Sequence, residues 1–365
     1  MLNYTSINFI VFYHLISLNA MLYSPTYFDI IVMMMMYAFT GFGITIGYHR
    51  LWSHKSFETN NLVKIILAFA GAGASEGSII LWTRQHRLHH RFSDTEHDPY
   101  GPQKGFLHSH ILWIFEVRHL SKLSTVNVSD IKYDPIIKFQ HDYYKYIALL
   151  CSFGVPLFTY FMSNRLNNYS DLIQCIIYPI AMSRLLTWHS TWFVNSLAHT
   201  YGTKPYGQSN SAKNHWITAL LTLGEGNHNY HHEFPYDYRN GIKYYEYDPT
   251  KAIIYFLYLI GFAWNLKTRE QLSESVINKT NGLTVDLTLD EYYSSERNLV
   301  IINNIIYDIT IFIENHPGGP NYMKMIIRQH PDTIKKKLNS INNHTDQMWG
   351  LLKHMKVGNL KEITH

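Results

Sequence analysis

Residues 49–54 read His-Arg-Leu-Trp-Ser-His, residues 86–90 read His-Arg-Leu-His-His, and residues 228–232 read His-Asn-Tyr-His-His. In the second and third clusters the spacing i, i+3, i+4 places three imidazoles on one face of a helix. In the first cluster the spacing i, i+5 would separate two rings by about 140° on a straight α-helix, so we expect the helix to end or bend there. Together the clusters predict a shared metal centre. A set of satisfied or solvent-facing histidines is the alternative, because the chain has 22 histidines in all.

The composition indicates a membrane protein with room for two domains. Of 365 residues, 46% are hydrophobic and 15% aromatic, while only 16% are charged. The net charge of +4 is small and spread along the chain, so no nucleic-acid surface is predicted. The two cysteines, Cys151 and Cys175, lie in apolar runs, which excludes a disulfide framework and a thiolate zinc site.

Four apolar segments are predicted to cross the membrane. The first two lie on either side of Ser24-Pro25-Thr26 and form a hairpin, because no charged residue precedes Asp29 and none occurs in residues 30–48. Residues 146–164 and 172–193 are the third and fourth. A cleaved signal peptide is the alternative for the first segment, although the basic region and small-residue cleavage site of such peptides are missing.

The spans also predict on which side the clusters lie. Two spans separate the second cluster from the third, so all three clusters emerge on the same side. The turn at residues 24–27 has no Lys or Arg, whereas residues 50–145 are rich in both, so that side is expected to be the cytosol. Arg184, in the fourth span, is costly in lipid and is expected to face the protein interior or water.

Further residues around the clusters carry a family resemblance. Ile44-Thr45-Ile46-Gly47 precedes the first cluster, Trp82-Thr83-Arg84-Gln85 the second and Gly224-Glu225-Gly226-Asn227 the third, and Asn195-Ser196-Leu197-Ala198-His199 forms a separate motif. With these motifs the chain closely resembles the membrane acyl-CoA Δ9 desaturases of the fungal type, which carry a C-terminal cytochrome b5 domain. The resemblance implies a mostly α, four-span transmembrane desaturase with a cytosolic di-iron cap, and a small α+β haem domain. The implied boundaries are 1–266 for the desaturase, 267–284 for a linker and 285–365 for the haem domain.

The resemblance also implies a ligand set for two iron ions. It comprises nine histidines, with Asn195 reaching the metal through water: His49, His54, His86, His89, His90, His199, His228, His231 and His232. Imidazole suits iron, and removing hydrogen from an unactivated methylene needs chemistry that side chains do not supply. Zinc is the alternative, but nine histidines exceed a tetrahedral need.

Carboxylates near the clusters are expected to orient these rings from behind. The candidates are Asp94, Asp98, Glu225 and Glu233, and each has a solvated loop carboxylate as its alternative. Glu225-x-x-His228 also fits a ferritin-like carboxylate site, but the same spacing recurs at Glu116/His119 and Glu362/His365, so the pattern carries little weight in a chain with 22 histidines. His97 is not expected to be a ligand, since the spacing after the second cluster departs from the family pattern.

Substrate contacts are expected at both ends of an acyl tunnel. Tyr37 and Gly41, one helical turn apart, match positions that close the far end of the tunnel in the family; a small Gly41 leaves room for C16–C18 chains, with plain helix packing as the alternative. Trp82 is a further predicted contact. The phosphates of coenzyme A are expected to meet basic residues on the cytosolic face, some of which would instead meet lipid head groups: Arg84 and Arg118, with Lys55, Arg87, Arg91 and Lys104.

The tail resembles cytochrome b5. His316-Pro317-Gly318-Gly319 is similar to a haem-binding loop, so His316 would be one axial ligand of haem b, and His344 falls at the place of the second. The resemblance therefore implies that electrons pass from NADH through a separate cytochrome b5 reductase to this haem and then to the di-iron centre.

The resulting prediction is a multi-pass enzyme of the endoplasmic reticulum membrane, with its histidine clusters and haem domain in the cytosol. It would use O2 to insert a cis double bond at carbon 9 of a saturated C16–C18 acyl-CoA, for unsaturated fatty acid biosynthesis. Two alternatives stay open. A hydroxylase, or a desaturase of another lipid or position, would share every histidine, and a non-enzymatic haem or metal sensor would give no lipid product.

Overall fold

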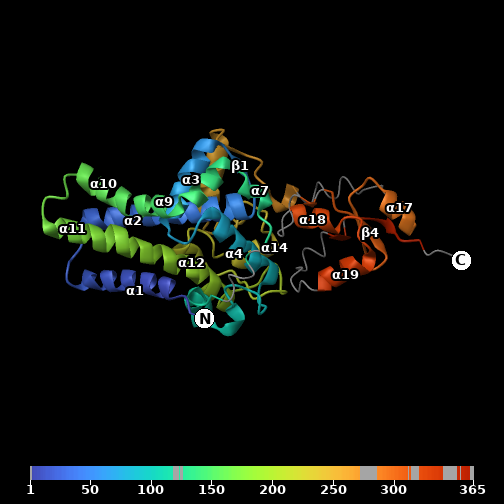
Figure 1. Ribbon diagram of the computed structural model, residues 1–365, viewed down its shortest axis with the longest axis horizontal. Helices are drawn as coiled ribbons and strands as arrows, with labels where there is room; N and C mark the ends of the chain where they lie inside the picture. Colours follow the sequence, from blue (N-terminus) through green and yellow to red (C-terminus); the bar gives the residue numbers. More distant parts are fainter. Residues whose placement is uncertain are drawn as a thin grey trace.

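The computed structural model describes residues 2–117, 123, 126–271, 286–310, 312–313, 320–339, 352–353 and 355–361. Figure 1 shows three parts along the longest axis of the molecule. Long helices run side by side at one end, a central part contains α4 (Ile79–Phe92) and α14 (His228–Glu233), and the C-terminal module lies at the other end. The second and third histidine clusters are therefore carried at the base of the helical arm.

The first two helices form the predicted hairpin. They are α1 (Tyr4–Leu18), followed by the 3-10 turn η1 (Asn19–Met21), and α2 (Tyr27–Phe42). A capping box starts α2, because the Thr26 side chain accepts from the Asp29 amide while the Asp29 carboxylate accepts from the Thr26 amide. The N-terminal end of α1 is fixed at the central part by a hydrogen bond from the Asn3 amide to the Phe115 carbonyl of 2.8 Å.

The helix after α2 resolves the i, i+5 spacing of the first cluster. The backbone continues without a break into the π-helix η2 (Gly43–Ser53), whose wider winding pairs residues five apart; the amide of His54 donates to the carbonyl of His49 at 3.1 Å. The expectation that the helix ends near the cluster is met at Ser53. The two imidazoles nevertheless share a face because the winding changes, and their ring centroids lie 4.8 Å apart.

Two further runs of helix complete the arm, each interrupted by π-helical winding. They are α9 (Tyr144–Leu149), η5 (Leu150–Gly154) and α10 (Val155–Met162), then α11 (Tyr169–Cys175), η6 (Ile176–Met182) and α12 (Ser183–Thr200). Pro156 is the second residue of α10, just after η5, and Pro179 lies inside η6, so each proline sits in or near an irregular segment. Among the described residues, two helices are long and apolar enough to cross a membrane, 27–53 and 144–162. The predicted count of four spans is therefore not established by length and composition.

Glycines allow the elements around the first cluster to pack closely. A Cβ on Gly43 would lie 2.2 Å from the backbone nitrogen of Gly71 in α3 (Asn61–Gly73), and a Cβ on Gly71 would lie 2.2 Å from the Tyr48 ring. Larger residues at these positions would separate η2 from α3. This contact holds the first cluster against the core that also supports α4, where Tyr48, Ile79 and Leu88 are fully buried.

Shorter elements close the central part. They are η3 (Pro102–Lys104), α5 (Phe106–His110), η4 (Leu112–Phe115), α7 (Ser129–Lys132), α8 (Pro135–Asp142), α13 (Trp216–Leu221), α15 (Pro249–Leu259) and the antiparallel pair β1 (Glu58–Thr59) and β2 (Ala263–Trp264).

The C-terminal module is a small α+β unit. Its antiparallel sheet has the order β3-β4-β5, from β3 (Leu299–Ile302), β4 (Ile305–Asp308) and β5 (Lys356–Asn359), with helices α17 (Leu289–Ser294), α18 (Pro320–Ile326) and α19 (Pro331–Asn339). Asn303 and Asn304, both with positive φ, make the tight β3–β4 turn. The predicted haem ligands His316 and His344 lie outside the described residues.

A shared apolar cluster joins this module to the central part. Tyr230, Phe234 and Tyr236, in and just after α14, pack in one buried cluster with residues of the module that include Val300 and Met323. Figure 1 accordingly shows α18 beside α14. The C-terminal module thus contacts the chain immediately around the third histidine cluster.

Candidate metal centre

The described structure brings all nine predicted histidines together in two adjacent groups. The first holds five, from η2 and its end, α4 and α14: His49, His54, His86, His90 and His231. The second holds four, from α4, α12 and α14: His89, His199, His228 and His232. Within each group the ligand atoms all lie within 4.8 Å of one another. Each group could hold one metal ion.

The rings meet through their Nε2 atoms. In the five-histidine group, His86 Nε2 lies 2.7 Å from that of His54 and 3.1 Å from that of His90, and His231 Nε2 lies 3.0 Å from that of His49. In the four-histidine group the corresponding Nε2 atoms lie 3.1–3.2 Å apart. A neutral imidazole carries a proton on only one of its two ring nitrogens. When several Nε2 atoms converge, they therefore lack enough protons to satisfy one another by hydrogen bonding. Lone pairs aimed at a common point are what a metal ion requires.

In two rings of the four-histidine group the opposite ring atom, Nδ1, faces an acceptor outside both groups. His89 Nδ1 lies 3.0 Å from Asp98, whose carboxylate is itself fixed by the amides of Asp94 and Tyr100. His199 Nδ1 lies 2.7 Å from the Ser211 hydroxyl, and Ser211 in turn donates to the Asp94 carboxylate. A proton held on Nδ1 in this way leaves Nε2 free to bind metal, which is the arrangement typical of metal-binding histidines.

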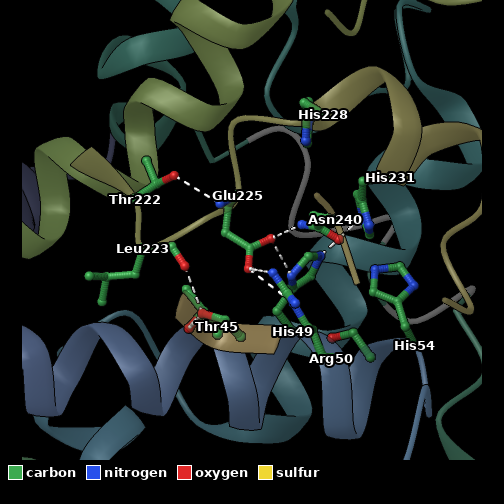
Figure 2. A network of polar contacts seen from close by, with 12 residues as sticks. Thr45, His49, Arg50, His54, Thr222, Leu223, Glu225, His228, His231 and Asn240 are labelled. Carbon is green, nitrogen blue, oxygen red and sulfur yellow. Dashed lines mark hydrogen bonds and ion pairs between the residues drawn. The ribbon is translucent and has the colours of Figure 1, made fainter. Parts of the chain in front are cut away.

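Glu225 orients His49 within a buried ion network (Figure 2). Its carboxylate lies 2.9 Å from His49 Nδ1. It accepts hydrogen bonds from the Arg50 guanidinium, at 2.9 Å, and from the side-chain amide of Asn240. The Arg50 guanidinium also pairs with Asp248 at 2.9 Å. Burial alone would raise the pKa of Glu225, but Arg50 and His49 outweigh it and hold that pKa below its usual value. The carboxylate is therefore charged at neutral pH.

Five of these imidazoles are held in the neutral, ligating form. Burial, and then the neighbouring rings of the same site, hold the pKa values of His86, His90, His199, His231 and His232 well below that of free imidazole. A protonated ring would carry a charge with no counter-ion at the centre of the site. The donor set thus fits two metal ions bound mainly by imidazole, as iron accepts, and it exceeds one tetrahedral zinc site.

A cavity of about 390 Å³ opens beside both groups. His49, His86, His89 and His228 contribute to its wall at one end, together with Asn195. From there it follows one face of η2 and α2, where lining residues recur every four positions at Thr45, Gly41 and Tyr37. Its wall is mostly apolar. The arrangement can hold a long, flexible apolar chain with one segment next to the two histidine groups.

Comparisons with known proteins agree with this arrangement. A model of the fatty acid desaturase family matches residues 26–258, and a model of the cytochrome b5-like haem/steroid binding domain matches residues 287–361. A probable acyl-CoA desaturase of Schizosaccharomyces pombe is 38% identical, over 88% of this chain and 69% of its own length. Acyl-CoA desaturase 1 of Saccharomyces cerevisiae is 34% identical, over 94% and 69%, and human stearoyl-CoA desaturase 5 is 37% identical, over 62% and 68%.

The chain belongs to the fatty acid desaturase family. This confirms the prediction of a desaturase with a fused cytochrome b5 domain, and it makes the protein a membrane-bound oxidoreductase of lipid metabolism. The family model for the C-terminal domain implies haem.

The predicted carboxylates differ in what they do in this desaturase. Asp98 and Glu225 contact metal-site rings directly, and Asp94 acts on His199 through Ser211. The Glu233 carboxylate instead lies against Gly207, where a Cβ would meet it at 2.0 Å, and accepts from Asn210 at 3.5 Å. Glu233 is therefore placed to hold the 207–210 loop.

The predicted substrate residues of the desaturase also divide. Trp82 lines the cavity, stacks on His86 and donates from Nε1 to Glu76 at 3.1 Å. Arg84 is not one of the described residues that line the cavity. Arg118 lies outside the described residues. Arg87 corrects an expectation, because it is buried and binds both oxygens of Asp130 at 2.8 Å instead of facing the cytosol.

Gly41 requires a correction as well. It lines the cavity one turn from Tyr37, as the tunnel prediction needs, but it does not leave free space. A Cβ at this position would lie 2.7 Å from the Cδ1 methyl of Leu223, so the Leu223 side chain occupies the room that the glycine provides. The size of the residue at position 41 alone is therefore a poor measure of cavity depth.

Several residues that position the site escaped the sequence interpretation. Glu76 accepts from Thr191 at 2.8 Å as well as from Trp82, and so ties two walls of the cavity together. Its sequence signal was a lone carboxylate directly after the Gly- and Ala-rich segment that ends α3. Asn240 and Ser211 had no local signal, because each acts on partners distant in sequence. Asp248 is also the N-cap of α15, where its side chain accepts from the Lys251 amide, but its contact with Arg50 had no local signal.

Proposed function

We propose that this protein uses O2 to insert a cis double bond at carbon 9 of saturated C16–C18 acyl-CoA. One observation carries the proposal: the two histidine groups share a wall with a long apolar cavity that follows α2. A metal sensor needs no such cavity, whereas an enzyme that acts in the middle of an acyl chain needs one. The names of the related acyl-CoA, stearoyl-CoA and Δ9 fatty acid desaturases support the substrate class and position.

The nine histidines would hold two iron ions, five rings on one and four on the other, with Asn195 reaching the metal through water. When bound, the iron pair would supply the oxygen chemistry that removes hydrogen from an unactivated methylene. The residues of the chain contribute by fixing the orientation of the histidine rings and the position of the acyl chain. Asp98 and Glu225 hold the Nδ1 protons of His89 and His49, so these rings present Nε2 to the metal.

The cavity wall would position the acyl chain against the metal site. Trp82 is fixed twice, by stacking on His86 with ring centroids 4.9 Å apart and by its hydrogen bond to Glu76. Trp82 therefore holds the cavity surface that the methylenes would contact at a fixed position relative to the His86 ring. Deeper along the cavity, Tyr37 is held by hydrogen bonds to Ser190, at 3.3 Å, and to the Leu221 carbonyl.

We further propose that the C-terminal domain, with haem b bound through His316 and His344, is the electron donor. A separate NADH-cytochrome b5 reductase would supply it. The apolar cluster that contains Tyr230, the residue before His231, also contains Val300 and Met323 of the domain, which supports a direct route to the metal site. Covalent fusion raises the effective concentration of the donor.

The proposed location is the endoplasmic reticulum membrane, with four spans and with the metal site and haem domain in the cytosol. Exposed apolar side chains support this on helices other than the two long candidates. On α1, Phe12, Leu15 and Leu18 are each more than half exposed, which is costly in water and favourable in lipid. Arg184 on α12 is buried, as a charged residue at membrane depth should be.

The test is expression in cells that lack their own Δ9 desaturase, followed by gas chromatography of total fatty acids. We expect new cis-9 16:1 and 18:1 acids. Hydroxy acids, or a double bond elsewhere, would replace the proposal by the related chemistry. An unchanged fatty acid profile from accumulated, metal-loaded protein would overturn it in favour of a sensor.

A further inference from the structure

The end of α13 carries an unusual residue. The amide of Gly224 donates to the carbonyl of Ala219 at 2.8 Å, which is the long hydrogen bond of a Schellman motif. In that motif the residue before the donor adopts the left-handed conformation, and glycine is the usual choice because it has no Cβ. Here that residue is Leu223, with φ of 55°. The protein thus has a bulky leucine at a position whose left-handed backbone conformation favours glycine.

The strained residue is fixed from both sides. Its carbonyl accepts from the Thr250 hydroxyl at 2.7 Å, and Thr250 meets the Thr45 hydroxyl of η2 at 2.8 Å. The preceding residue, Thr222, accepts from the amide of Glu225 at 3.1 Å, which links the turn to the metal-site network. Figure 2 shows the Leu223 side chain turned away from the Glu225 carboxylate. Left-handed residues held in this way are typical of functional sites.

The Leu223 side chain lines the acyl cavity opposite α2. The lining residues of η2 and α2 extend over at most about 18 Å from His49 to Tyr37. Leu223 meets this row at Gly41, one turn before Tyr37, with its Cδ1 methyl 2.7 Å from the position of a Cβ. It therefore lines the cavity beside Gly41, eight residues along this row from His49.

We propose that Leu223 is a chain-length determinant, whose contact with Gly41 sets how deeply the methyl end of the acyl chain can enter. The inference rests on the proposed function, since it concerns the substrate of the same site. A smaller residue at 223 would lengthen the cavity by the volume of the lost side chain. A larger residue at 41 would displace the Leu223 methyl into the cavity and shorten it.

The test compares Leu223→Gly, Gly41→Ala and the double variant in the fatty acid assay. In an apolar pocket each methylene discriminates by roughly tenfold or more. We therefore expect Leu223→Gly to raise the ratio of 18- and 20-carbon to 16-carbon products by roughly tenfold, and Gly41→Ala to lower it. In the double variant the alanine methyl fills the vacated space, so the ratio should return toward that of the unsubstituted chain instead of showing the sum of both effects.

Leu220→Ala is the matched control, because it shortens a leucine of α13, three residues before Leu223, at a position that is 52% exposed. Its product ratio should not change. Leu223→Gly should accumulate normally, since glycine relieves the left-handed backbone; if it does not accumulate, Gly41→Ala decides alone. Unchanged ratios in substituted proteins that make product would overturn the proposal.

Failure of the proposed function can be distinguished from failure of this inference. If the unsubstituted chain makes no unsaturated acid, the function fails, and thermal stabilisation of the purified full chain by saturated acyl-CoAs of graded length replaces the product ratio. If Leu223→Gly prefers longer acyl chains than the unsubstituted protein, Leu223 is still supported as a chain-length determinant. If both proteins prefer the same chain length, that role is overturned.

Discussion

The metal site and the acyl cavity each contain a carboxylate in their wall, and the two are handled in opposite ways. Glu225 pairs with Arg50 at 2.9 Å and orients His49. Glu76, on the cavity wall, accepts from the neutral donors Trp82 and Thr191. Burial raises the pKa of Glu76 to about 7, despite these hydrogen bonds, whereas Arg50 holds the pKa of Glu225 below its usual value.

The difference shows where this fold maintains charge. Behind the metal ligands a charged carboxylate would strengthen the bond of His49 to a cation, so its counter-ion, Arg50, is built into the core, where Arg50 also pairs with Asp248. Beside an apolar acyl chain a charge would need solvation that the chain does not give. A carboxyl that is readily neutralised fits that wall better.

The largest expected effect comes from removing one ligand from either histidine group. His231 and His232 are neighbours on α14 but belong to different groups. His231→Ala and His232→Ala should each abolish desaturation and each reduce bound iron to about half, because the other group keeps its ligands. Gas chromatography and metal analysis of purified protein check this.

His97→Ala is the control, since His97 is exposed and belongs to neither group. It should keep both activity and iron. Product at the unsubstituted level from either α14 variant would contradict the two-group assignment.

A smaller but still large effect should follow from breaking the Glu225 network. Glu225→Ala leaves the buried Arg50 with Asp248 as its remaining carboxylate and should cost about 3 kcal/mol of stability. Glu225→Gln keeps an acceptor for Arg50 and should cost less, yet weaken metal binding about 10- to 100-fold by withdrawing charge from His49. Thermal unfolding and metal titration separate the two quantities.

Asp98→Asn is the matched change in the four-histidine group. Asp98 orients His89 but is held by backbone amides, with no arginine to leave unpaired. It should therefore weaken metal binding to a similar degree with a smaller loss of stability. Equal loss of stability from Glu225→Ala and Asp98→Asn would contradict the contrast between the two supports.

The residues that bind metal were predictable from the sequence, but their supports were not. The i, i+3, i+4 spacing is a local property of a helix, and α4 and α14 follow it. The i, i+5 pair needed η2, a π-helix whose first residue, Gly43, packs closely against α3. The contact between His49 and Glu225 joins residues far apart in sequence, so no local pattern reports it.

Residue size and charge were misleading where a distant partner decided the environment. Gly41 indicated open space, but Leu223, from a turn after α13, fills it. Arg87 indicated a cytosolic phosphate contact, but Asp130 and the backbone carbonyls of Trp52 and Ser53 enclose its guanidinium. In both cases the sequence identified the element correctly and the tertiary contact reversed the role of the side chain.

The smallest expected effect concerns Glu76 and pH. Its folded pKa of about 7 lies above the ordinary value of 4.5, so the folded protein binds more protons than the unfolded chain between these values. Stability should therefore fall as pH rises from about 4.5 to 7 and then level off, by at most about 3 kcal/mol from this group and less where the cavity admits water.

Glu76→Gln removes the titration while keeping an acceptor for Trp82 or Thr191. Its melting temperature relative to the unsubstituted protein should be lowest near pH 5 and rise toward pH 8. Glu225, with its lowered pKa, contributes in the opposite sense, because its stabilisation is complete above its unfolded pKa and is lost as pH falls. If the difference between the variant and the unsubstituted protein is the same at pH 5 and pH 8, Glu76 is charged throughout, and the contrast between the two walls fails.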